Sequence, residues 1–560
     1  SLTEVDTGVI FSRMEPTDRD SARDYDWLVV GSGFGGSVSA LRLSEKGHRV
    51  GVLESGRRYT DEDFPSSTWD LRRYYWAPRA GLRGIFRLSL FRDVSVVSGC
   101  GVGGGSLGFA NTLYRAPLRF YEDPQWAGLE DWQAALAPHY DEAERMLGVS
   151  DVTADDPADR LLREFGDTLG VGHTYSKARV GVYFGEPGKT VPDPYFGGDG
   201  PARTGCTTCG RCMVGCPVGA KNTLVKNYLW FAERNGADVL PERTVTSIRP
   251  LGAGDGSEGY ELTSERSGAW LRKDRRTHTA RGVVLAAGAL GTNLLLQRCR
   301  ESGTLRISDR LGELVRTNSE AILAVTVPDD YPEDLTGRVA ITSSIYPDPD
   351  THIETVVYGS AGDSMSTLYT FLVGDGTRLT RPLKLLAKVL RHPGRFARML
   401  DPRGWSRRTI ILLVMQTLDN AIALRPKRTR LGGMRLETEQ DPLRPNPTFI
   451  PVANQAAEWI AERTGGVAQS SVMEALLNVP TTAHILGGAV IAASPEKGVV
   501  DSRLRVFGYD NLMVCDGAAI PANVGVNPSL TIAALAEHAM SHVPAAGGEP
   551  AAETVGAPAP

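Results

Sequence analysis

YDWLVVGSGFGGSVSALRLSEKGHRVGVLES, residues 25 to 55, decides the fold of this 560-residue chain. Its first six residues, Tyr25 to Val30, form an apolar run that indicates a buried parallel strand. Residues 37–45 have the composition and apolar spacing of a helix, and residues 49–55 give a second strand. Strand, helix and strand in this order predict a βαβ nucleotide-binding unit.

The turn after the first strand carries a dinucleotide fingerprint, G-x-G-x-x-G, formed by Gly31, Gly33 and Gly36. Such glycines allow a tight turn and close approach of a pyrophosphate, and the following helix N-terminus favours phosphate. Glu54, 18 residues after Gly36, can accept a hydrogen bond from an adenosine ribose. An ordinary glycine loop is the alternative, and the motif alone does not distinguish FAD from NAD.

The same strand, glycine turn and helix pattern returns at residues 281–296, so the nucleotide-binding domain is expected to be re-entered there. Residues 319–482 alternate Thr- and Val-rich strand candidates with polar loops, which favours a mixed or antiparallel sheet carrying a substrate pocket. We therefore expect a dinucleotide-binding domain in three segments, residues 20–119, 205–318 and 483–542. We also expect a cap segment at 120–204, a substrate domain at 319–482 and a disordered Ala/Pro/Gly tail at 543–560.

Composition excludes several classes of protein. The formal net charge of -5 argues against general nucleic-acid binding, and no apolar run approaches the ~20 residues that a spanning helix needs. The first residues, SLTEVDTGVIFSRMEP, show no secretory signal, and we expect a cytoplasmic protein.

Four of the seven cysteines lie within eleven residues of sequence, with the spacing C-x2-C-x2-C-x3-C-P: Cys206, Cys209, Cys212 and Cys216. Bacterial ferredoxins hold iron–sulfur clusters with this spacing, so a [4Fe–4S] or [3Fe–4S] cluster is one interpretation. The fourth ligand could instead be Cys100 or Cys515. A structural zinc site, a pair of disulfides or free thiols on a loop are the alternatives.

Three segments resemble the glucose-methanol-choline (GMC) family of FAD oxidoreductases, in its actinobacterial cholesterol oxidase-like branch. They are GCGVGGGSLGFANTLYRA at 99–116, AHILGGA at 483–489, and VCDGAAIPANVGVNPSLTIAALAEHA at 514–539. Residues 180–206 and 311–321 extend the resemblance over nearly the whole chain. It implies an α/β fold in which a discontinuous Rossmann-like FAD domain accompanies a substrate domain of mixed or antiparallel sheet plus helices.

The resemblance also implies the site residues. His484 and Asn527 become the catalytic pair, since a histidine can take the proton of an alcohol as hydride leaves its carbon. Glu320 is a candidate for the additional glutamate base of cholesterol oxidases. The residues expected at the FAD are Gly31, Gly33, Phe34, Gly35, Gly36, Glu54, Gly103, Gly104, Gly105, Ser106, Asn111, Val245, Asp516, Gly517, Asn527 and Pro528.

The expected reaction is oxidation of an alcohol to a carbonyl, with a hydroxysteroid or similar hydrophobic alcohol as substrate and oxygen, a quinone or a protein as electron acceptor. One alternative is a GMC dehydrogenase for a secondary metabolite or sugar that passes electrons through an iron–sulfur cluster to a partner. Another is an electron-transfer subunit. Whether the enzyme is an oxidase or a dehydrogenase stays open.

A basic stretch is the last feature. Residues 378–408 contain ten Lys or Arg and one acid, Asp401, with Leu, Val, Phe and Trp between them. Such a segment can lie on an anionic membrane surface, or it can be a solvated helix face.

Overall fold

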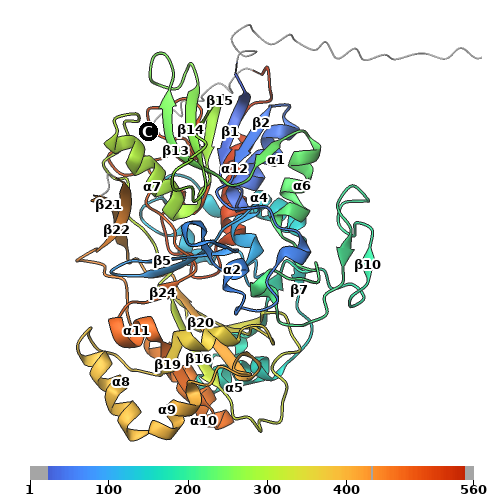
Figure 1. Cartoon of the computed structure of the whole chain (residues 1–560), viewed down its shortest axis with the longest axis vertical. Helices are drawn as coiled ribbons and strands as arrows, with labels where there is room; N and C mark the ends of the chain where they lie inside the picture. The colour runs from blue at the N-terminus through green and yellow to red at the C-terminus, as the bar shows by residue number, and fades with distance from the viewer. Residues whose placement is uncertain (1–22, 431–432, 549–560) are drawn as a thin grey trace, which may run out of the picture.

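The computed structural model describes residues 23–430 and 433–548. Its upper part in Figure 1 is built on a seven-stranded sheet of order β12-β2-β1-β15-β14-β13, with β25 pairing β15. The strands at its centre are parallel: β12 (Asp238–Leu240), β2 (Val50–Leu53), β1 (Tyr25–Val30), β15 (Arg276–Leu285) and β25 (Leu512–Val514). β13 (Arg243–Pro250) and β14 (Tyr260–Arg266) add an antiparallel edge. Segments far apart in sequence therefore form one sheet.

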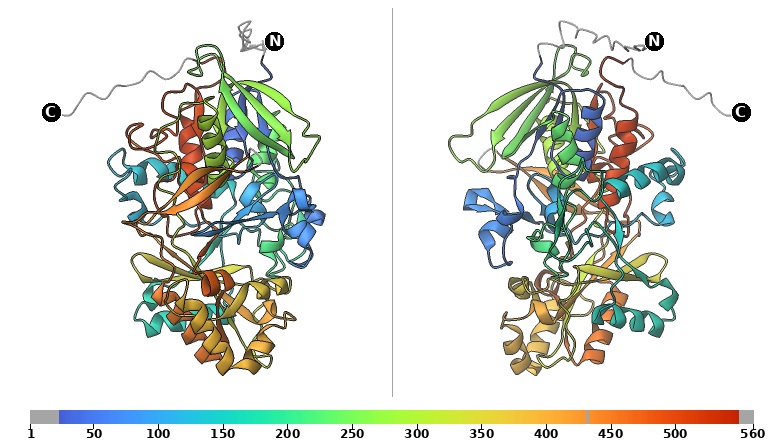
Figure 2. Two further views of the ribbon diagram at one scale, coloured as in Figure 1. Left: turned by 60° about the vertical axis from the view of Figure 1, so that its left-hand side comes forward. Right: turned by 90° about the vertical axis from the view of Figure 1, so that its right-hand side faces the viewer.

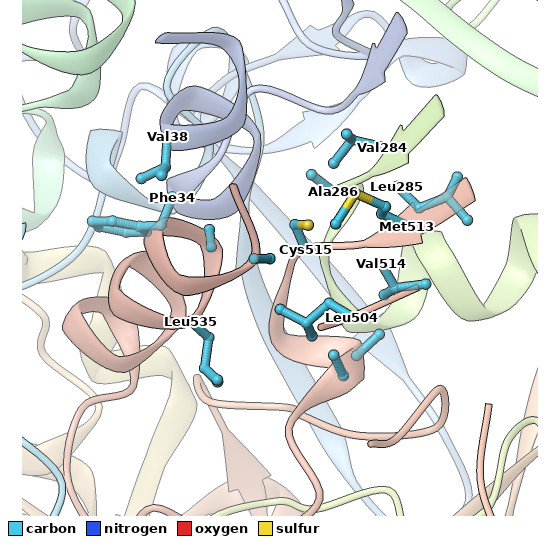
Figure 3. Packing of buried hydrophobic residues seen from close by; sticks show 14 of the residues in the cluster. Phe34, Val38, Val284, Leu285, Ala286, Leu504, Met513, Val514, Cys515 and Leu535 are labelled. Atoms are coloured by element: carbon cyan, nitrogen blue, oxygen red, sulfur yellow. The ribbon is translucent and has the colours of Figure 1, made fainter. Parts of the chain in front are cut away.

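Helices bury the central strands of this sheet. α1 (Phe34–Glu45) packs on α12 (Ser529–Ser541) and α6 (Tyr228–Arg234), and α12 packs on α4 (Trp132–Met146). α7 (Gly288–Glu301) follows β15 directly. Figure 3 shows the core between them, where Phe34, Val284 and Leu535 converge from α1, β15 and α12. Strands that are apolar over their buried part, such as WLVV in β1, are what a parallel sheet covered on its faces requires.

The lower part of Figure 1 contains a second seven-stranded sheet of order β19-β23-β16-β20-β18-β17-β8. All its pairings are antiparallel. Its long strands are β16 (Ala321–Thr326), β17 (Ile341–Asp348), β18 (Thr351–Val356), β20 (Thr409–Gln416) and β23 (Val467–Ser471), and its short ones β8 (Ser176–Lys177) and β19 (Tyr369–Phe371). α5 (Pro157–Thr168) and α10 (Pro451–Thr464) pack against it. Thr- and Val-rich sequence at 319–482 thus forms the antiparallel sheet that was expected.

Further elements connect and decorate the two sheets. A three-stranded sheet joins β5 (Phe86–Leu90), β6 (Ser95–Gly99) and β24 (Thr481–Thr482), and β21 (Ile422–Arg428) forms a hairpin with β22 (Met434–Gln440). α8 (Thr380–Arg391) and α9 (Pro393–Met399) lie at the lower end of the molecule in Figures 1 and 2, and α11 (Val472–Leu477) packs on α8 beside the second sheet. The short elements are α2 (Leu71–Tyr74), α3 (Leu118–Tyr121), β3 (Trp76–Ala77), β4 (Leu82–Arg83), β7 (Ser150–Asp151), β9 (Arg179–Val180), β10 (Thr190–Val191) and β11 (Arg203–Thr204).

The predicted fold class is confirmed, while the exact domain boundaries stay a prediction. Two local expectations need correction. The first helix begins at Phe34 rather than Ser37, because Gly35 and Gly36 already belong to it. The tail was expected to be disordered from residue 543, but its first residues pack on the domain: Val543 is buried, and Ala546 N–H donates to Lys46 O at 2.9 Å. Residues 20–22 and 549–560 lie outside the described part of the chain.

No helix of the described residues is long and apolar enough to cross a membrane.

Candidate active site

The fingerprint glycines are required by close packing. A Cβ on Gly31, whose φ is +103°, would lie 2.2 Å from Ala286 O, and one on Gly36 would lie 2.1 Å from Gly31 O. Gly33 differs, because the nearest atom to its Cβ position is 4.0 Å away. Gly33 is also the N-cap of α1 and puts no side chain over the helix end. The start of α1 is therefore open to a phosphate, as the fingerprint predicts.

Glu54 lies beside this open helix end and is held rigidly. Its Oε2 accepts hydrogen bonds from Ser32 N at 3.0 Å and Ser32 Oγ at 2.7 Å, and its Oε1 accepts from Gly56 N at 2.7 Å. The residue is buried at the carboxyl end of β2. Ser55 Oγ also donates to Oε1, at 3.3 Å, which is the longest of the four contacts. A ribose hydroxyl that binds to Glu54 would take the place of this weakest contact.

The second glycine loop meets the first. Gly103 N–H donates to Ser32 Oγ at 3.1 Å, and a Cβ on Gly104 would lie 2.6 Å from Gly33 Cα. Gly104 also has a φ of +52°. Ser106 serves the chain itself: its hydroxyl donates to Gly103 O at 2.7 Å and accepts from Leu224 N. The two loops thus form one glycine-lined cradle.

Asn111 ends this loop with a polar group that has no partner. The residue is fully buried in the left-handed region, at φ 75°, and neither amide atom forms a hydrogen bond within the described chain. Buried polar groups in proteins are nearly always bonded. An unpartnered amide at the end of a glycine cradle fits a bound polar ring, as the resemblance to flavin enzymes implies.

The C-terminal signature closes the cradle from the other side. Asp516 accepts from Thr292 Oγ1 at 2.5 Å and Ala518 N at 2.8 Å, and burial raises its pKa to about 6. A Cβ on Gly35 would lie 1.5 Å from Cys515 O, so this segment packs directly on α1. Pro528 is the N-cap of α12. These contacts position the segment that precedes Asn527.

Glycine packing, the uncapped helix end and the unpartnered Asn111 amide together fit FAD. The remaining predicted contacts lie on the same framework: Phe34 begins α1, Gly105 and Gly517 belong to the two loops, and Val245 is a buried residue of β13. Their contacts with the cofactor stay predictions.

His484 follows β24, and a buried carboxylate orients its ring. Its Nδ1 is bonded to Oε1 of Glu320, and Glu320 Oε2 accepts from Ala483 N at 2.8 Å. The Glu320 side chain has no exposed surface, and that of His484 is 13% exposed. A carboxylate can only accept, so Nδ1 carries the hydrogen and Nε2 is left free to accept a proton. Glu320, a candidate base by sequence, is placed by the structure as the positioning residue of His484.

Asn527 lies against a second buried carboxylate, Glu354, in β18. Three buried oxygens, Asn527 Oδ1 and both carboxylate oxygens of Glu354, form no hydrogen bond among the described residues. Burial raises the pKa of Glu354 to about 8, Asn527 opposes this shift, and the charge of Glu320 adds to it. At neutral pH the Glu354 carboxyl is therefore largely protonated and neutral.

His352 completes the buried group. It shares the face of β18 with Glu354, and its Nδ1 lies 3.9 Å from Glu354 Oε1. Burial lowers its pKa to about 3, and Tyr114 and Tyr346 pack against its ring with centroids at 5.2 and 4.6 Å. The side chains packed around His352 are therefore aromatic, and His352 itself is neutral at neutral pH.

The sequence predicted His484 and Asn527 but missed Glu354 and His352. The local signal was the spacing of His352 and Glu354, two titratable residues at i and i+2 in the strand THIETV, which places both on one face. Nothing in the sequence shows that this face points at Asn527.

All four clustered cysteines are free thiols that line one small cavity, together with Asn111 and Lys221. Burial raises the pKa of Cys206 to about 11 and that of Cys212 to about 12, and it lowers the pKa of Lys221 to about 8. Among the residues described, no three His, Cys, Asp or Glu side chains are placed to hold a single metal ion. The structure therefore contains no disulfide bond within residues 206–216, which was one of the alternatives for these cysteines.

The structure combines a glycine-lined dinucleotide cradle with an oriented histidine and with an asparagine beside a buried carboxylate, which fits a flavin-dependent oxidoreductase. Residues 202–305 and 415–536 match the two family models described as GMC oxidoreductase. Cholesterol oxidase of Mycobacterium tuberculosis strain H37Rv is 52% identical over 92% of this chain and 91% of its own length. The chain belongs to the GMC oxidoreductase family, so its cofactor is FAD.

Other relatives agree with this assignment. Cholesterol oxidase of Acinetobacter baumannii is 48% identical over 93% of this chain and 95% of its own length. The crystal structure of a pyridoxine 4-oxidase, described as from Mesorbium loti, superposes with a TM-score of 0.59 at 17% identity, covering 92% of this chain and 98% of that one. That similarity shows the fold alone. The chain is thus an FAD-dependent alcohol oxidoreductase.

Proposed function

We propose that the protein oxidises the hydroxyl group of a steroid or a similar hydrophobic alcohol, with oxygen as the electron acceptor. The observation that carries the proposal is a buried polar group: the His484–Glu320 pair, with Glu354 interacting with both Glu320 and Asn527. The rings of Tyr114 and Tyr346 pack on the neighbouring His352. Two relatives named cholesterol oxidase, 52% and 48% identical over almost the full chain, support the substrate class.

The chain's residues divide the work on the alcohol. FAD, when bound, supplies the acceptor for the hydride that leaves the carbinol carbon. His484 Nε2 is free to take the hydroxyl proton, because Glu320 holds Nδ1 in the donor state. The amide of Asn527 can hold the substrate oxygen by donating a hydrogen bond, but it cannot act as a base.

Glu354 gives the site a second proton carrier. In the resemblance to cholesterol oxidases an additional glutamate moves a proton after oxidation, and Glu354 has the burial and the position beside Asn527 for that role. We propose that it shifts the double bond of a 5-ene-3-keto steroid by taking a proton from one carbon and returning it to another. Because such a base must be ionised, the isomerisation rate should rise with pH through about 8.

A substrate panel tests this proposal. Purified enzyme is given a 3β-hydroxysteroid, a long-chain primary alcohol and an amino sugar at equal concentration, with oxygen uptake and product mass as readouts. We expect preference for the steroid, one oxygen consumed per product, and a product two mass units lighter. Preference for the sugar, or no oxygen uptake with any alcohol, would overturn the proposal.

A second candidate is a dehydrogenase for a sugar or secondary metabolite in which the four cysteines hold an iron–sulfur cluster. The observation that favours it is the placement of four free thiols, with ferredoxin-like spacing in sequence, around one small cavity. An alcohol gives up two electrons, which a cluster would pass singly to a quinone or protein acceptor. Anaerobic assays of iron and labile sulfide decide it: stoichiometric iron supports the cluster, and iron-free enzyme that is fully active with oxygen removes it.

A further inference from the structure

The last unexplained feature is the exposed face of α8 and α9, the helix pair at the lower end of the molecule in Figure 1. Four leucines of this segment follow the spacing 4, 3, 4 and so lie on one helix face: Leu379, Leu383, Leu386 and Leu390. Their relative exposures are 79%, 65%, 53% and 71%. Leu400, just after α9, is 65% exposed. We call these five residues the leucine face.

The opposite side of α8 already anchors the helix to the second domain. Leu385 packs with Phe371, Val373 and Ala475 in a buried cluster, and the fully buried Arg381 donates to Thr448 O and Asn478 Oδ1 at 2.9 Å each. Most amphipathic helices turn their apolar side inward. Here α8 is fixed with its leucines outward, so the exposed apolar face is a defined surface of the folded protein.

The same two helices also carry positively charged side chains. Arg391, Arg395 and Arg398 are exposed on α8 and α9, and within residues 23–430 and 433–548 none of the three forms an ion pair. The only acid of the segment, Asp401, is engaged by Arg403 at 2.7 Å. Exposed leucines and unpaired arginines on the same helix pair are complementary to a lipid surface that is both apolar and anionic.

The leucine face is joined to the strand that leads to His484. α8 packs on α11, where Leu476 and Leu477 are 43% and 51% exposed. Arg378 donates to Arg92 O at 2.7 Å, next to β5 with its exposed Leu90. Through β6, the same small sheet contains β24, which ends two residues before His484. Apolar side chains thus extend from α8 toward the active-site strand.

We propose that α8 and α9 dock the enzyme on an anionic phospholipid bilayer through the leucine face and these arginines. Docking goes beyond the proposed reaction and needs no substrate, although it would bring the active-site strand close to a bilayer that holds a hydrophobic alcohol. A second copy of the chain is the competing occupant of such a face, and it lacks the argument of charge, because the arginines would meet themselves across a symmetric contact.

Co-sedimentation of the FAD-loaded enzyme with sucrose-filled vesicles tests the proposal. Vesicles of phosphatidylcholine alone are compared with vesicles containing phosphatidylglycerol at ~0.1 M salt. We expect binding to the anionic vesicles that falls on the order of 100-fold in R391Q/R395Q/R398Q, since each basic residue near such a surface contributes about fivefold. The variant L383Q/L386Q/L390Q should lose binding even at low salt.

Controls come from the exposed loop after β14, which lies beside Pro78 and Arg79 and is separate in sequence from α8 and α9. Leu271 is 94% exposed and Arg272 is exposed beside it, and L271Q/R272Q should bind vesicles like the wild type. Retained flavin absorbance shows that each variant is folded, and turnover of a cyclodextrin-solubilised alcohol should be unchanged. Three results would overturn the proposal. The wild-type enzyme could fail to bind anionic vesicles, all variants could bind them equally, or the wild type could be a dimer that only the leucine variant dissociates.

Discussion

Replacement of Glu320 by Gln tests how the site prepares His484. The carboxylate makes two hydrogen bonds, to His484 Nδ1 and to Ala483 N at 2.8 Å, in a place with no solvent. A glutamine has one acceptor oxygen, and Ala483 N–H needs it. The amide NH2 must then face Nδ1, which turns His484 into the tautomer with its hydrogen on Nε2. That tautomer cannot take a proton from the alcohol.

The expected loss is therefore that of a general base. Such groups contribute about 100- to 10,000-fold, which corresponds to about 3–5 kcal/mol in the barrier. The assay is anaerobic stopped-flow reduction of the bound flavin by substrate alcohol, with kcat and KM measured separately. We expect kcat to fall with little change in KM, because substrate binding does not use Glu320.

Glu474→Gln is the matched control. Glu474 is also a fully buried glutamate whose pKa is raised to about 8, but it lies in α11 beside Arg381 and not on His484. Both variants lose a buried carboxyl, so a difference between them reports the contact with His484. If E320Q binds flavin fully and reduces it at a rate within about threefold of the wild type, Glu320 does not set the tautomer of His484.

Three further predictions concern the cradle, the second carboxylate and the catalytic pair. Gly104→Ala should weaken FAD binding at least ~10-fold, measured by flavin retention on dilution, because its Cβ meets Gly33 Cα at 2.6 Å; Gly303 also has a positive φ but open space around its Cβ position, so Gly303→Ala should retain FAD. Glu354 has a raised pKa, so the folded state binds its proton more tightly than the unfolded state between about pH 4.5 and 8, and the free energy of unfolding should fall with rising pH across that window. Denaturant titrations at pH 5 and 8 should show a smaller fall in Glu354→Gln; an equal fall in both proteins would contradict the assignment. Asn527→Asp should slow flavin reduction at least ~10-fold, since a carboxylate cannot donate to the substrate oxygen; unchanged reduction would remove Asn527 from the site.

Local sequence predicted the parts of the site that sit at turns. The glycine fingerprint with Glu54, and the C-terminal segment with Asp516 and Asn527, each need particular residue types within a short span, so a motif can carry them. The parallel sheet followed from apolar strands next to glycine turns.

The remainder depends on tertiary register. Glu354 and His352 lie in a central strand of the antiparallel sheet, and only the pairing of β18 with β20 brings their face toward Asn527. Glu320 was visible in sequence, but its bond to His484 joins residues 164 positions apart. The outward direction of the α8 leucines depends equally on a distant contact, the anchoring of Leu385 and Arg381.

Anaerobic absorption spectra of the wild type and His484→Ala, taken before and after mixing with a 3β-hydroxysteroid, show whether the protein is a flavin enzyme that uses His484 to oxidise the alcohol. We predict the bands of bound flavin in both proteins, rapid bleaching in the wild type, and bleaching at least ~100-fold slower in the variant. A wild-type protein without flavin bands, or a variant that bleaches at the wild-type rate, would contradict the account.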